Sequence, residues 1–462
     1  MFNFDTTYSS LPEHLFTFTS PVKVTDPKFI ITNKSLIKEL GLADIPKEEL
    51  LEYLSGNKII DGSTPLAQAY AGHQFGNLAI LGDGRAVLLG EHTTPSGEKV
   101  DIQLKGSGRT PYSRGGDGRG SLYSMLREFV ISDAMEKLGV ATTKSLAIIA
   151  TGEDVHRNNG NRGGIVTRVA SSHIRVGTFV YVALKSDTAQ LKIFADYVIN
   201  RHYPTIAKDD NPYLSLVTEV IHRQADLIVD WMRVGFIHGV MNTDNMAISG
   251  ETIDYGPCAF MDTYDPKTVF SSIDHNGRYS FENQRNIGGW NIARFAESLV
   301  TLIDSDEDKA ITKLNKAMTH YSDYFDEKYN IMMAAKIGIS EASSTTIELS
   351  SELLTLMDEH HLDYTTTFRN LVSSNLEELS SWYPKWKELE IDTALMDRTN
   401  PAVIPRNHIV ENALTNGADH DNLTPLIELL KAQKTPYSNS SPDYFVSPPQ
   451  EVASAYRTYC GT

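Results

Sequence analysis

A strand, a glycine-rich loop and a helix follow one another early in the chain, and this succession constrains the fold more than any other feature. Residues 100–105 alternate apolar and polar side chains, as a strand with one apolar face does. Residues 106–120 hold six glycines and few apolar side chains. Apolar residues then recur at helical spacing over residues 122–138, with Ser121 placed to cap the helix. The pattern predicts a sheet with a helix beside it.

Two charged residues stand out on these elements. Lys105 lies on the polar face of the predicted strand, and Glu128 follows it 23 positions later (128 − 105) on the predicted helix. A lysine held by a buried glutamate can meet a phosphate as a fixed point charge. The pair therefore indicates a phosphate site, while a surface lysine and a solvated glutamate remain the alternative.

A glycine turn precedes this strand. Two short apolar runs, residues 78–81 and 86–89, flank Gly82, Gly84 and Arg85 and predict a β-hairpin. Glycines at its tip would let backbone N–H groups approach a phosphate, although a plain turn has the same composition.

The loop after the strand is basic within an acidic chain. It places Arg109, Arg114 and Arg119 around a single acid, Asp117. Arginine side chains together with exposed backbone N–H groups bind polyphosphates. Arg168 and Arg175 lie farther along, and we expect them to join the same anion site. A flexible, solvated loop is the alternative interpretation.

Residues 238–256 resemble the catalytic segment of a protein kinase with one essential change. A kinase has His-x-Asp, an Asn five residues after that Asp, and a second Asp after a short hairpin. Asn245 and Asp254 occupy the metal-binding positions and are hard oxygen ligands for Mg²⁺ or Mn²⁺. Val240 stands where the base should be and cannot accept a proton. Asp244 is the only nearby carboxylate that could replace it. A short hairpin over residues 246–253 is predicted between Asn245 and Asp254. A non-catalytic pseudokinase remains the alternative interpretation.

Composition excludes several classes of protein. The 462 residues carry a formal net charge of −17, which argues against generic nucleic-acid binding. No stretch of the sequence is apolar enough for a membrane helix, and the N-terminal residues do not resemble a targeting peptide. Cys258 and Cys460 are the only cysteines, which excludes a disulfide scaffold. We expect a cytoplasmic protein, and a monomer, that binds neither nucleic acid nor membrane.

Longer motifs resemble the SelO (YdiU) family of protein adenylyltransferases. The resemblance runs from about residue 65 to residue 299, with further similarity at residues 400–414 and at the C-terminus. The motifs that carry it are residues 70–76 (YAGHQFG), 103–108 (QLKGSG), 119–121 (RGS), 242–246 (NTDNM), 254–257 (DYGP) and 290–291 (WN).

The resemblance implies an α+β fold of the two-lobed protein-kinase type, with ATP bound in a flipped orientation. It implies AMP transfer from ATP to Ser, Thr or Tyr hydroxyls of protein substrates, with Mg²⁺ or Mn²⁺, and UMP transfer in some bacterial members with Mn²⁺. Asp244 is the implied base, Asn245 and Asp254 the metal ligands, and Glu128 the partner of Lys105. The implied nucleotide contacts are Gly82, Gly84, Arg85, Lys105, Asp117, Gly118, Arg168, Arg175 and Asp254.

Some relatives have a redox-active cysteine or selenocysteine three residues from the C-terminus, as Cys460 is here. The segment at residues 271–272, where relatives place its partner, has no cysteine, so Cys258 is the candidate partner.

We expect three regions: an N-terminal extension (1–60), a nucleotide-binding core (61–310) and a mostly helical C-terminal region (311–462). The alternatives in function are a conventional phosphotransferase and a non-catalytic ATP-binding scaffold.

Overall fold

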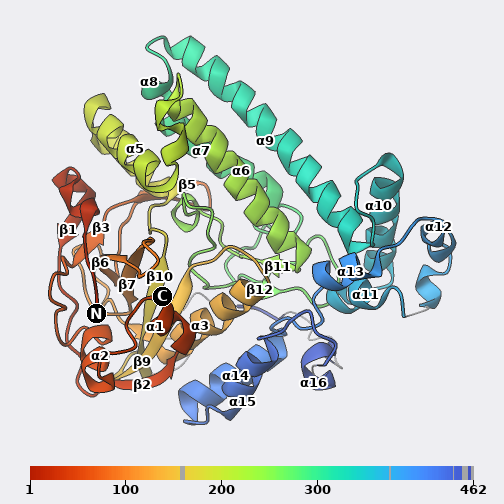
Figure 1. The fold of residues 1–462 in the computed structure, drawn as a ribbon, viewed down its shortest axis with the longest axis horizontal. Helices are drawn as coiled ribbons and strands as arrows, with labels where there is room; N and C mark the ends of the chain where they lie inside the picture. The colour runs from red at the N-terminus through yellow and green to blue at the C-terminus, as the bar shows by residue number, and fades with distance from the viewer. Residues whose placement is uncertain (157–161, 374–375, 441, 450–455, 459–462) are drawn as a thin grey trace.

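An antiparallel sheet forms one lobe, and long helices form the other (Figure 1). The computed structural model describes residues 1–462 except 157–161, 374–375, 441, 450–455 and 459–462. The sheet has the order β1-β3-β6-β7-β10-β9-β2, and β8 pairs with β10. The strands are β1 (Phe16–Phe18), β2 (Lys28–Thr32), β3 (Leu66–Gln68), β6 (Ala86–Thr93), β7 (Lys99–Lys105), β8 (Gly120–Ser121), β9 (Lys144–Asp154) and β10 (Arg162–Ala170).

The strand and helix predicted around the glycine-rich loop are confirmed. β7 lies in the sheet between β6 and β10, and α3 (Leu122–Lys137) packs against β9 and β10. The Ser121 side chain accepts a hydrogen bond from the Ser124 backbone N–H, which caps α3 at its start. The polar face of β7 is buried as well as the apolar one, since Asp101 and Gln103 are at most 2% exposed. Asp101 can be buried because Arg201 lies 2.7 Å from its carboxylate.

The first 60 residues contribute to the sheet. β1 pairs with β3, and β2 pairs with β9. Two short helices, α1 (Lys34–Glu39) and α2 (Lys47–Leu54), cover an apolar cluster that includes Leu146 and Ile149 of β9. This segment therefore supplies both edge strands of the main sheet and covers part of one of its faces.

Both predicted hairpins are wrong. β5 (Asn77–Ile80) pairs with β4 (Ala71–Gln74), whereas β6 pairs with β3 and β7, so the glycine turn connects two different sheets. It is held there because the Asp83 N–H donates to the Gln68 carbonyl at 2.9 Å. In the second case, Ala247 bridges to Arg175 and Thr252 to Thr142 instead of to each other. Partners distant in sequence replace the local ones in both places.

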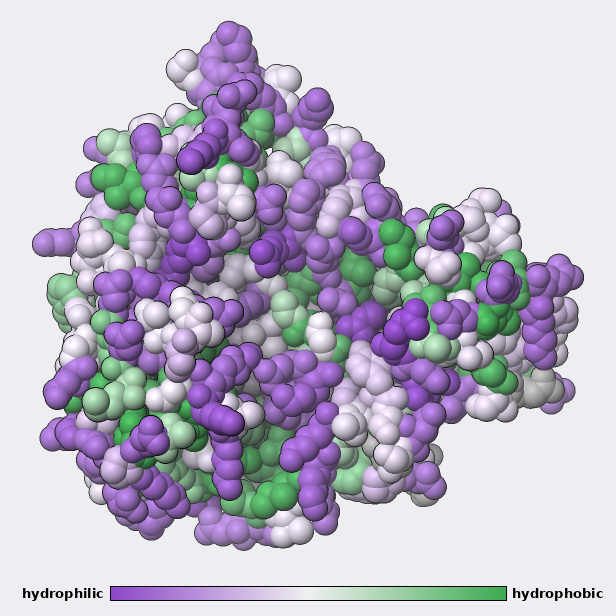
Figure 2. All heavy atoms as spheres, viewed as in Figure 1, coloured by the Kyte–Doolittle hydropathy of each residue, from purple (hydrophilic) through white to green (hydrophobic). Residues whose placement is uncertain are grey.

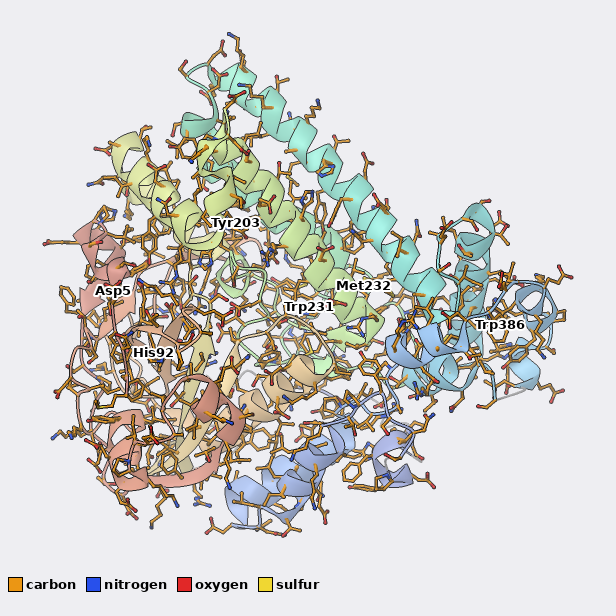
Figure 3. All side chains as sticks on the ribbon, viewed as in Figure 1. Asp5, His92, Tyr203, Trp231, Met232 and Trp386 are labelled. Atoms are coloured by element: carbon orange, nitrogen blue, oxygen red, sulfur yellow. The ribbon has the colours of Figure 1, made fainter. Side chains whose placement is uncertain are left out.

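The helical lobe is built on the amphipathic helix α6, which begins at Pro212. Trp231 near its end packs against Phe236 of β11 (Phe236–Ile237), with 5.7 Å between the ring centres (Figure 3), and β11 pairs with β12 (Ala259–Phe260). The helices around it are α4 (Val176–Lys185), α5 (Thr188–His202), α6 (Pro212–Arg233), α7 (Gln284–Ser298), α8 (Val300–Ile303) and α9 (Glu307–Lys336). α9 packs along α6 for much of its length (Figure 1).

The region after residue 310 is helical, as predicted. It contains the end of α9 and α10 (Ser344–Glu359), α11 (Tyr364–Asn370), α12 (Tyr383–Lys387), α13 (Thr393–Thr399), α14 (Asn407–Asp419), α15 (Thr424–Ala432) and α16 (Asp443–Val446). Trp386 stacks on Trp382 at 5.3 Å in a part of this region that lies far from the sheet (Figure 3). α14 and α15 instead return to pack against α3. The outer face in this view is mostly polar, with smaller apolar patches (Figure 2).

A buried arginine joins this C-terminal region to the rest of the molecule. The fully buried Arg406 side chain lies 2.7 Å from Asp262, just after β12, and 2.5 Å from Asp363, the N-cap of α11. Both aspartates are largely buried, so each needs the guanidinium as its counter-charge.

We predict that Arg406→Met lowers stability by about 3 kcal/mol, because it leaves two aspartates without a counter-charge. Thermal unfolding measures the change. The matched control is Arg398→Met, whose exposed ion pair with Asp392 spans 3.7 Å and contributes little. Adding Asp262→Asn and Asp363→Asn to Arg406→Met should recover most of the loss. An Arg406→Met protein as stable as the Arg398→Met control would contradict the assignment.

Candidate active site

A cavity of about 620 Å³ lies between the two lobes and collects nearly all the predicted site residues. The sheet lobe and its loops contribute one wall, and residues 240–257 the other. Glu128 lies behind Lys105 rather than at the wall, and Cys258 does not line the cavity. The predicted residues at the wall are Gly82, Gly84, Arg85, Lys105, Asp117, Gly118, Arg168, Arg175, Asp244, Asn245 and Asp254.

Three cations converge on the Asp254 carboxylate. Lys105 Nζ lies 2.8 Å from Oδ1, Arg168 Nη2 lies 2.5 Å from Oδ1, and Arg175 Nη1 lies 2.9 Å from Oδ2. We name these four residues the Asp254 charge cluster. Glu128 supports it from behind, since its carboxylate is 2.7 Å from Lys105 Nζ and is also hydrogen-bonded by Arg168. The predicted Lys105–Glu128 pair is present and buried.

The cations dominate the electrostatics of both carboxylates. Burial by itself would raise the pKa of Asp254, but Arg168, and then Lys105 and Arg175, hold that pKa well below its usual value. Burial likewise opposes ionisation of Glu128, and Arg168 and Lys105 lower its pKa. Both groups are therefore carboxylates at neutral pH.

Asp254 also has an unusual backbone. Its φ is +65°, in the left-handed region that side-chain-bearing residues seldom adopt. The ion pairs on both carboxylate oxygens hold it there. Such conformations cluster at functional sites because the surroundings must over-determine them.

Asp244 lines the same cavity, on the same wall as Asp254. Its Oδ1 atom is buried and has no hydrogen-bond partner. Burial raises the pKa of Asp244 to about 6, with Arg175 acting in the opposite direction. Gly72 allows the close approach of β4, because a Cβ at that position would lie 2.2 Å from Asp244 Oδ1. Asp244 thus brings a carboxyl group with a raised pKa to the cavity wall, whereas the Val240 side chain is apolar.

Asn245 completes a set of oxygen donors. Its side-chain N–H donates to the Val240 carbonyl at 2.9 Å, which leaves the amide oxygen for another partner. Asn245 and Asp254 both line the cavity, and amide and carboxylate oxygens are the ligands preferred by Mg²⁺ and Mn²⁺. Within the described residues no cluster of three or more His, Cys, Asp or Glu side chains is positioned for a metal. The donor set therefore fits a hard cation that also takes ligands from a bound substrate, as Mg²⁺ does with phosphates.

The basic loop, residues 106–120, supplies fewer cations to the cavity than its composition suggested. Arg109 closes the loop on itself by donating to the carbonyls of Gly115 and Gly116, each at 2.9 Å, and does not line the cavity. Arg119 lines it but is engaged by Glu153 at 2.9 Å. Arg114 also lies at the wall. The buried cations come mainly from Lys105, β10 and the start of α4.

Sequence reasoning gave no role to two further residues. The Tyr70 ring lies 4.5 Å from the Arg175 guanidinium and supports its orientation. Asp83 is buried 3.9 Å from Arg175, and burial raises its pKa. Both occur inside segments that the sequence singled out, the YAGHQFG motif and the glycine turn. Their contact with Arg175, about 100 positions away in the sequence, could not be predicted because it produces no local sequence pattern.

The structure describes only one of the two cysteines. Cys258 is fully buried, and burial raises the pKa of its thiol to about 11, so it is a poor nucleophile at neutral pH. Cys460 lies outside the described residues. The nearby Thr458 side chain donates to the Pro257 carbonyl at 2.7 Å, so the tail passes beside the residue that precedes Cys258. The redox pairing stays a prediction.

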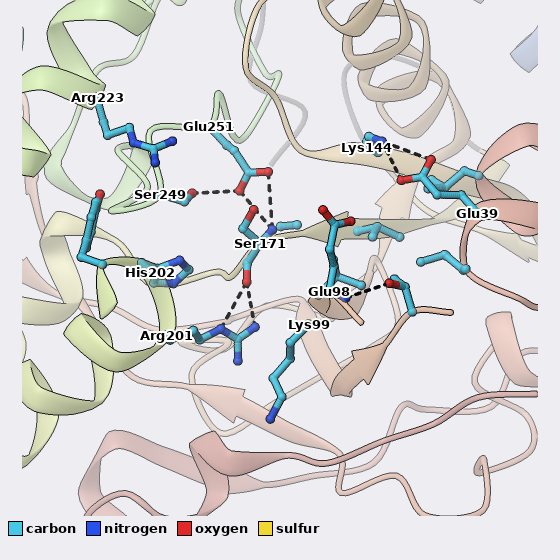
Figure 4. Close-up of a pocket in the computed structure, with 17 residues that line it drawn as sticks. Glu39, Glu98, Lys99, Lys144, Ser171, Arg201, His202, Arg223, Ser249 and Glu251 are labelled. Carbon is cyan, nitrogen blue, oxygen red and sulfur yellow. Dashed lines mark hydrogen bonds and ion pairs between the residues drawn. The ribbon is translucent and has the colours of Figure 1, made fainter. Parts of the chain in front are cut away.

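A second cavity of about 400 Å³ lies among β7, β10, α1 and the end of α5 (Figure 4). Two of its basic groups are ion-paired: Lys144 lies 3.0 Å from Glu39, and Arg201 lies 2.6 Å from Glu91. Burial lowers the pKa of His202 there to about 3, so this imidazole is neutral at neutral pH. This cavity contains none of the predicted site residues.

Known proteins match this chain over its length. The family described as "Protein adenylyltransferase SelO" matches residues 1–383. Proteins named "Protein nucleotidyltransferase YdiU" from Alkaliphilus metalliredigens and Anoxybacillus flavithermus are each 50% identical to it, and the alignments cover 100% of this chain and 98% and 99% of theirs. A rhoptry kinase from Toxoplasma gondii aligns with 68% of this chain and 99% of its own at 11% identity, with a TM-score of 0.24.

The similarity extends beyond the motifs recognised in the sequence. Residues 1–64 fall within the family match, and the relatives align with the whole chain, including its C-terminal helices. The predicted enzyme class is confirmed by this agreement. The chain belongs to the SelO family of protein adenylyltransferases.

Proposed function

We propose that this enzyme transfers AMP from ATP to Ser, Thr or Tyr hydroxyls of proteins, and UMP from UTP when Mn²⁺ is the metal. The observation that carries the proposal is a cavity that brings the buried Asp244 carboxyl group together with the three cations of the Asp254 charge cluster. A proton acceptor and a polyphosphate-binding cluster are the two parts that nucleotidyl transfer to a hydroxyl requires.

The cations supply most of the binding energy in this proposal. Lys105, Arg168 and Arg175 compensate Asp254 in the structure and would contact the phosphates when nucleotide is bound. Asn245 and Asp254 would hold a divalent cation, which supplies Lewis-acid stabilisation of phosphate charge. Gly82, Gly84, Arg85, Asp117 and Gly118 would complete the nucleotide contacts from the sheet lobe.

Asp244 acts on the acceptor. The hydroxyl oxygen attacks the α-phosphorus, the bond from that phosphorus to the α,β-bridging oxygen breaks, and pyrophosphate leaves. The hydroxyl proton passes to the Asp244 carboxylate, whose raised pKa suits a base near neutral pH. This requires the nucleotide to lie with its α-phosphate, rather than its γ-phosphate, beside Asp244.

Two other functions are less well supported. A phosphotransferase needs a base at the position of Val240, which has no polar side chain. A scaffold that only binds ATP needs no buried carboxyl group with a raised pKa beside its phosphate-binding cations. We further propose that the protein is a monomer that acts in the cytoplasm, and that it has the three regions given above. Among the described helices, none is both long and apolar enough to cross a membrane.

Labelled ATP separates the candidate functions. With metal and a mixture of cell proteins, we expect label from the α-phosphate to be retained on protein and label from the γ-phosphate to be released as pyrophosphate. Intact-mass analysis should show an adduct of the size of AMP. Protein-bound label from the γ position alone would establish phosphotransfer instead.

We predict that Asp254→Asn reduces AMP transfer by at least about 100-fold, because the substitution keeps the shape but removes the charge that holds the metal. The rate of transfer to protein at saturating ATP and metal measures the effect. The control is Asp265→Asn, in which an exposed aspartate outside the cavity is changed in the same way. Near-normal transfer by Asp254→Asn would remove Asp254 from the metal site.

We predict that Asp244→Asn reduces kcat by about 10²- to 10⁴-fold while the affinity for ATP changes little, because an amide cannot accept the proton. Equilibrium binding of ATP and single-turnover transfer separate the two quantities. A loss of ATP binding with unchanged turnover at saturation would mean that Asp244 contacts the nucleotide and is not the base.

A further inference from the structure

A tryptophan held between two arginines lies on the helical lobe near the candidate base. The guanidinium groups of Arg278 and Arg294 each lie 5.0 Å from the centre of the Trp290 ring. The His73 ring meets the same indole edge-on at 5.3 Å. We call these four residues the arginine–tryptophan cluster. It brings together α7, the loop that precedes it, and strand β4.

The cluster is joined to the segment that carries Asp244. The His73 backbone N–H lies 2.8 Å from the hydroxyl of Thr243, which directly precedes Asp244, and His73 Nδ1 lies 3.2 Å from the same hydroxyl. The β4–β5 turn is fixed as well, because the Phe75 N–H donates to the Asn242 side chain at 3.1 Å. A group bound at the cluster would therefore lie beside the acceptor position.

The two arginines are poorly compensated. Within the part of the chain that the structure describes, no carboxylate lies within ion-pair distance of Arg278, and the only one near Arg294 is Glu297, three positions along the same helix. That Glu297 side chain is 57% exposed, so the pair contributes little. Both Nε atoms are buried without a hydrogen-bond partner. In a protein of net charge −17, this is an unusual local excess of positive charge.

The surface beside the cluster suits a polypeptide. Leu78 and Ile80 of β5 are 49% and 48% exposed, and they lie opposite His73 and Ala71 in the β4–β5 register. Directly paired residues share a face of the sheet, so these apolar side chains lie on the same face as His73. A free phosphate or pyrophosphate would have no use for such a surface.

We propose that the arginine–tryptophan cluster binds an Asp or Glu side chain of the protein substrate, close in sequence to the hydroxyl that receives AMP. Guanidinium groups backed by an indole offer a planar, pre-oriented site for a carboxylate. The preferred substrates are then acidic segments, with apolar residues resting on Leu78 and Ile80. This inference rests on the proposed function and names the substrate class for the same site.

Degenerate peptide libraries test the preference. Each library has a mixture of Ser, Thr and Tyr at its centre, and Glu, Gln or Lys fixed in turn at each flanking position. We expect kcat/KM for AMP transfer to be roughly fivefold or more higher with Glu than with Gln at one or two positions. Raising the salt concentration should reduce this ratio, since the contact lies at the surface. Equal rates for the Glu and Gln libraries at every position would overturn the inference.

Paired variants assign the preference to the cluster. Arg278→Gln with Arg294→Gln should remove the preference for Glu by raising KM for peptide, while kcat and KM for ATP stay near wild type. Arg278→Lys with Arg294→Lys should keep part of it, because charge is retained. The matched control is Arg285→Gln, which removes an arginine of α7 that pairs with Asp326 of α9 instead.

The outcomes separate this inference from the proposed function. A raised KM for ATP in the Arg278→Gln/Arg294→Gln variant would place these arginines on the nucleotide and overturn the inference alone, as would an unchanged preference for Glu. Wild-type enzyme that binds ATP but transfers no AMP to any library or to total cell protein would overturn the proposed function, and this inference with it.

Discussion

The carboxylate of Asp254, shared by three cations, is the interaction on which the arrangement of the site depends. Lys105 and Arg168 come from the paired strands β7 and β10, Arg175 from the start of α4, and Asp254 from the helical lobe. One charged centre thus joins the sheet to the helices across the cavity. It is stable because each buried charge has a partner at ion-pair distance.

The same centre would bind the polyphosphate in the proposed function. Cations that already lie in a dry, fixed position need little reorganisation when phosphate oxygens join or replace the carboxylate as their partners. In the proposed function, Asp254 would then be available to a metal ion. Arg175 of the charge cluster also donates to the Asp244 backbone carbonyl at 2.8 Å, which places the Asp244 carboxyl group, the proposed base, beside the cluster.

Local patterns in the sequence predicted the parts of the fold that depend on local interactions. Three features could be predicted because each involves residues close in sequence. They are the alternation in β7, the Ser121 cap of α3 and the spacing of Asn245 and Asp254. The two hairpins were wrong because distant partners, such as Gln68 for Asp83 and Arg175 for Ala247, compete with the neighbouring strand. Arg109 was misjudged because a side chain that satisfies its own loop looks in sequence like one that binds a ligand. The arginine–tryptophan cluster escaped notice because Arg278, Trp290 and His73 meet only in three dimensions.

A crystal structure with a non-hydrolysable ATP analogue and Mg²⁺ would test the central claim most directly. The account predicts that the α-phosphorus lies nearest to Asp244, with the β- and γ-phosphates against Lys105, Arg168 and Arg175. A γ-phosphorus beside Asp244, with the adenine where a conventional kinase holds it, would contradict the account.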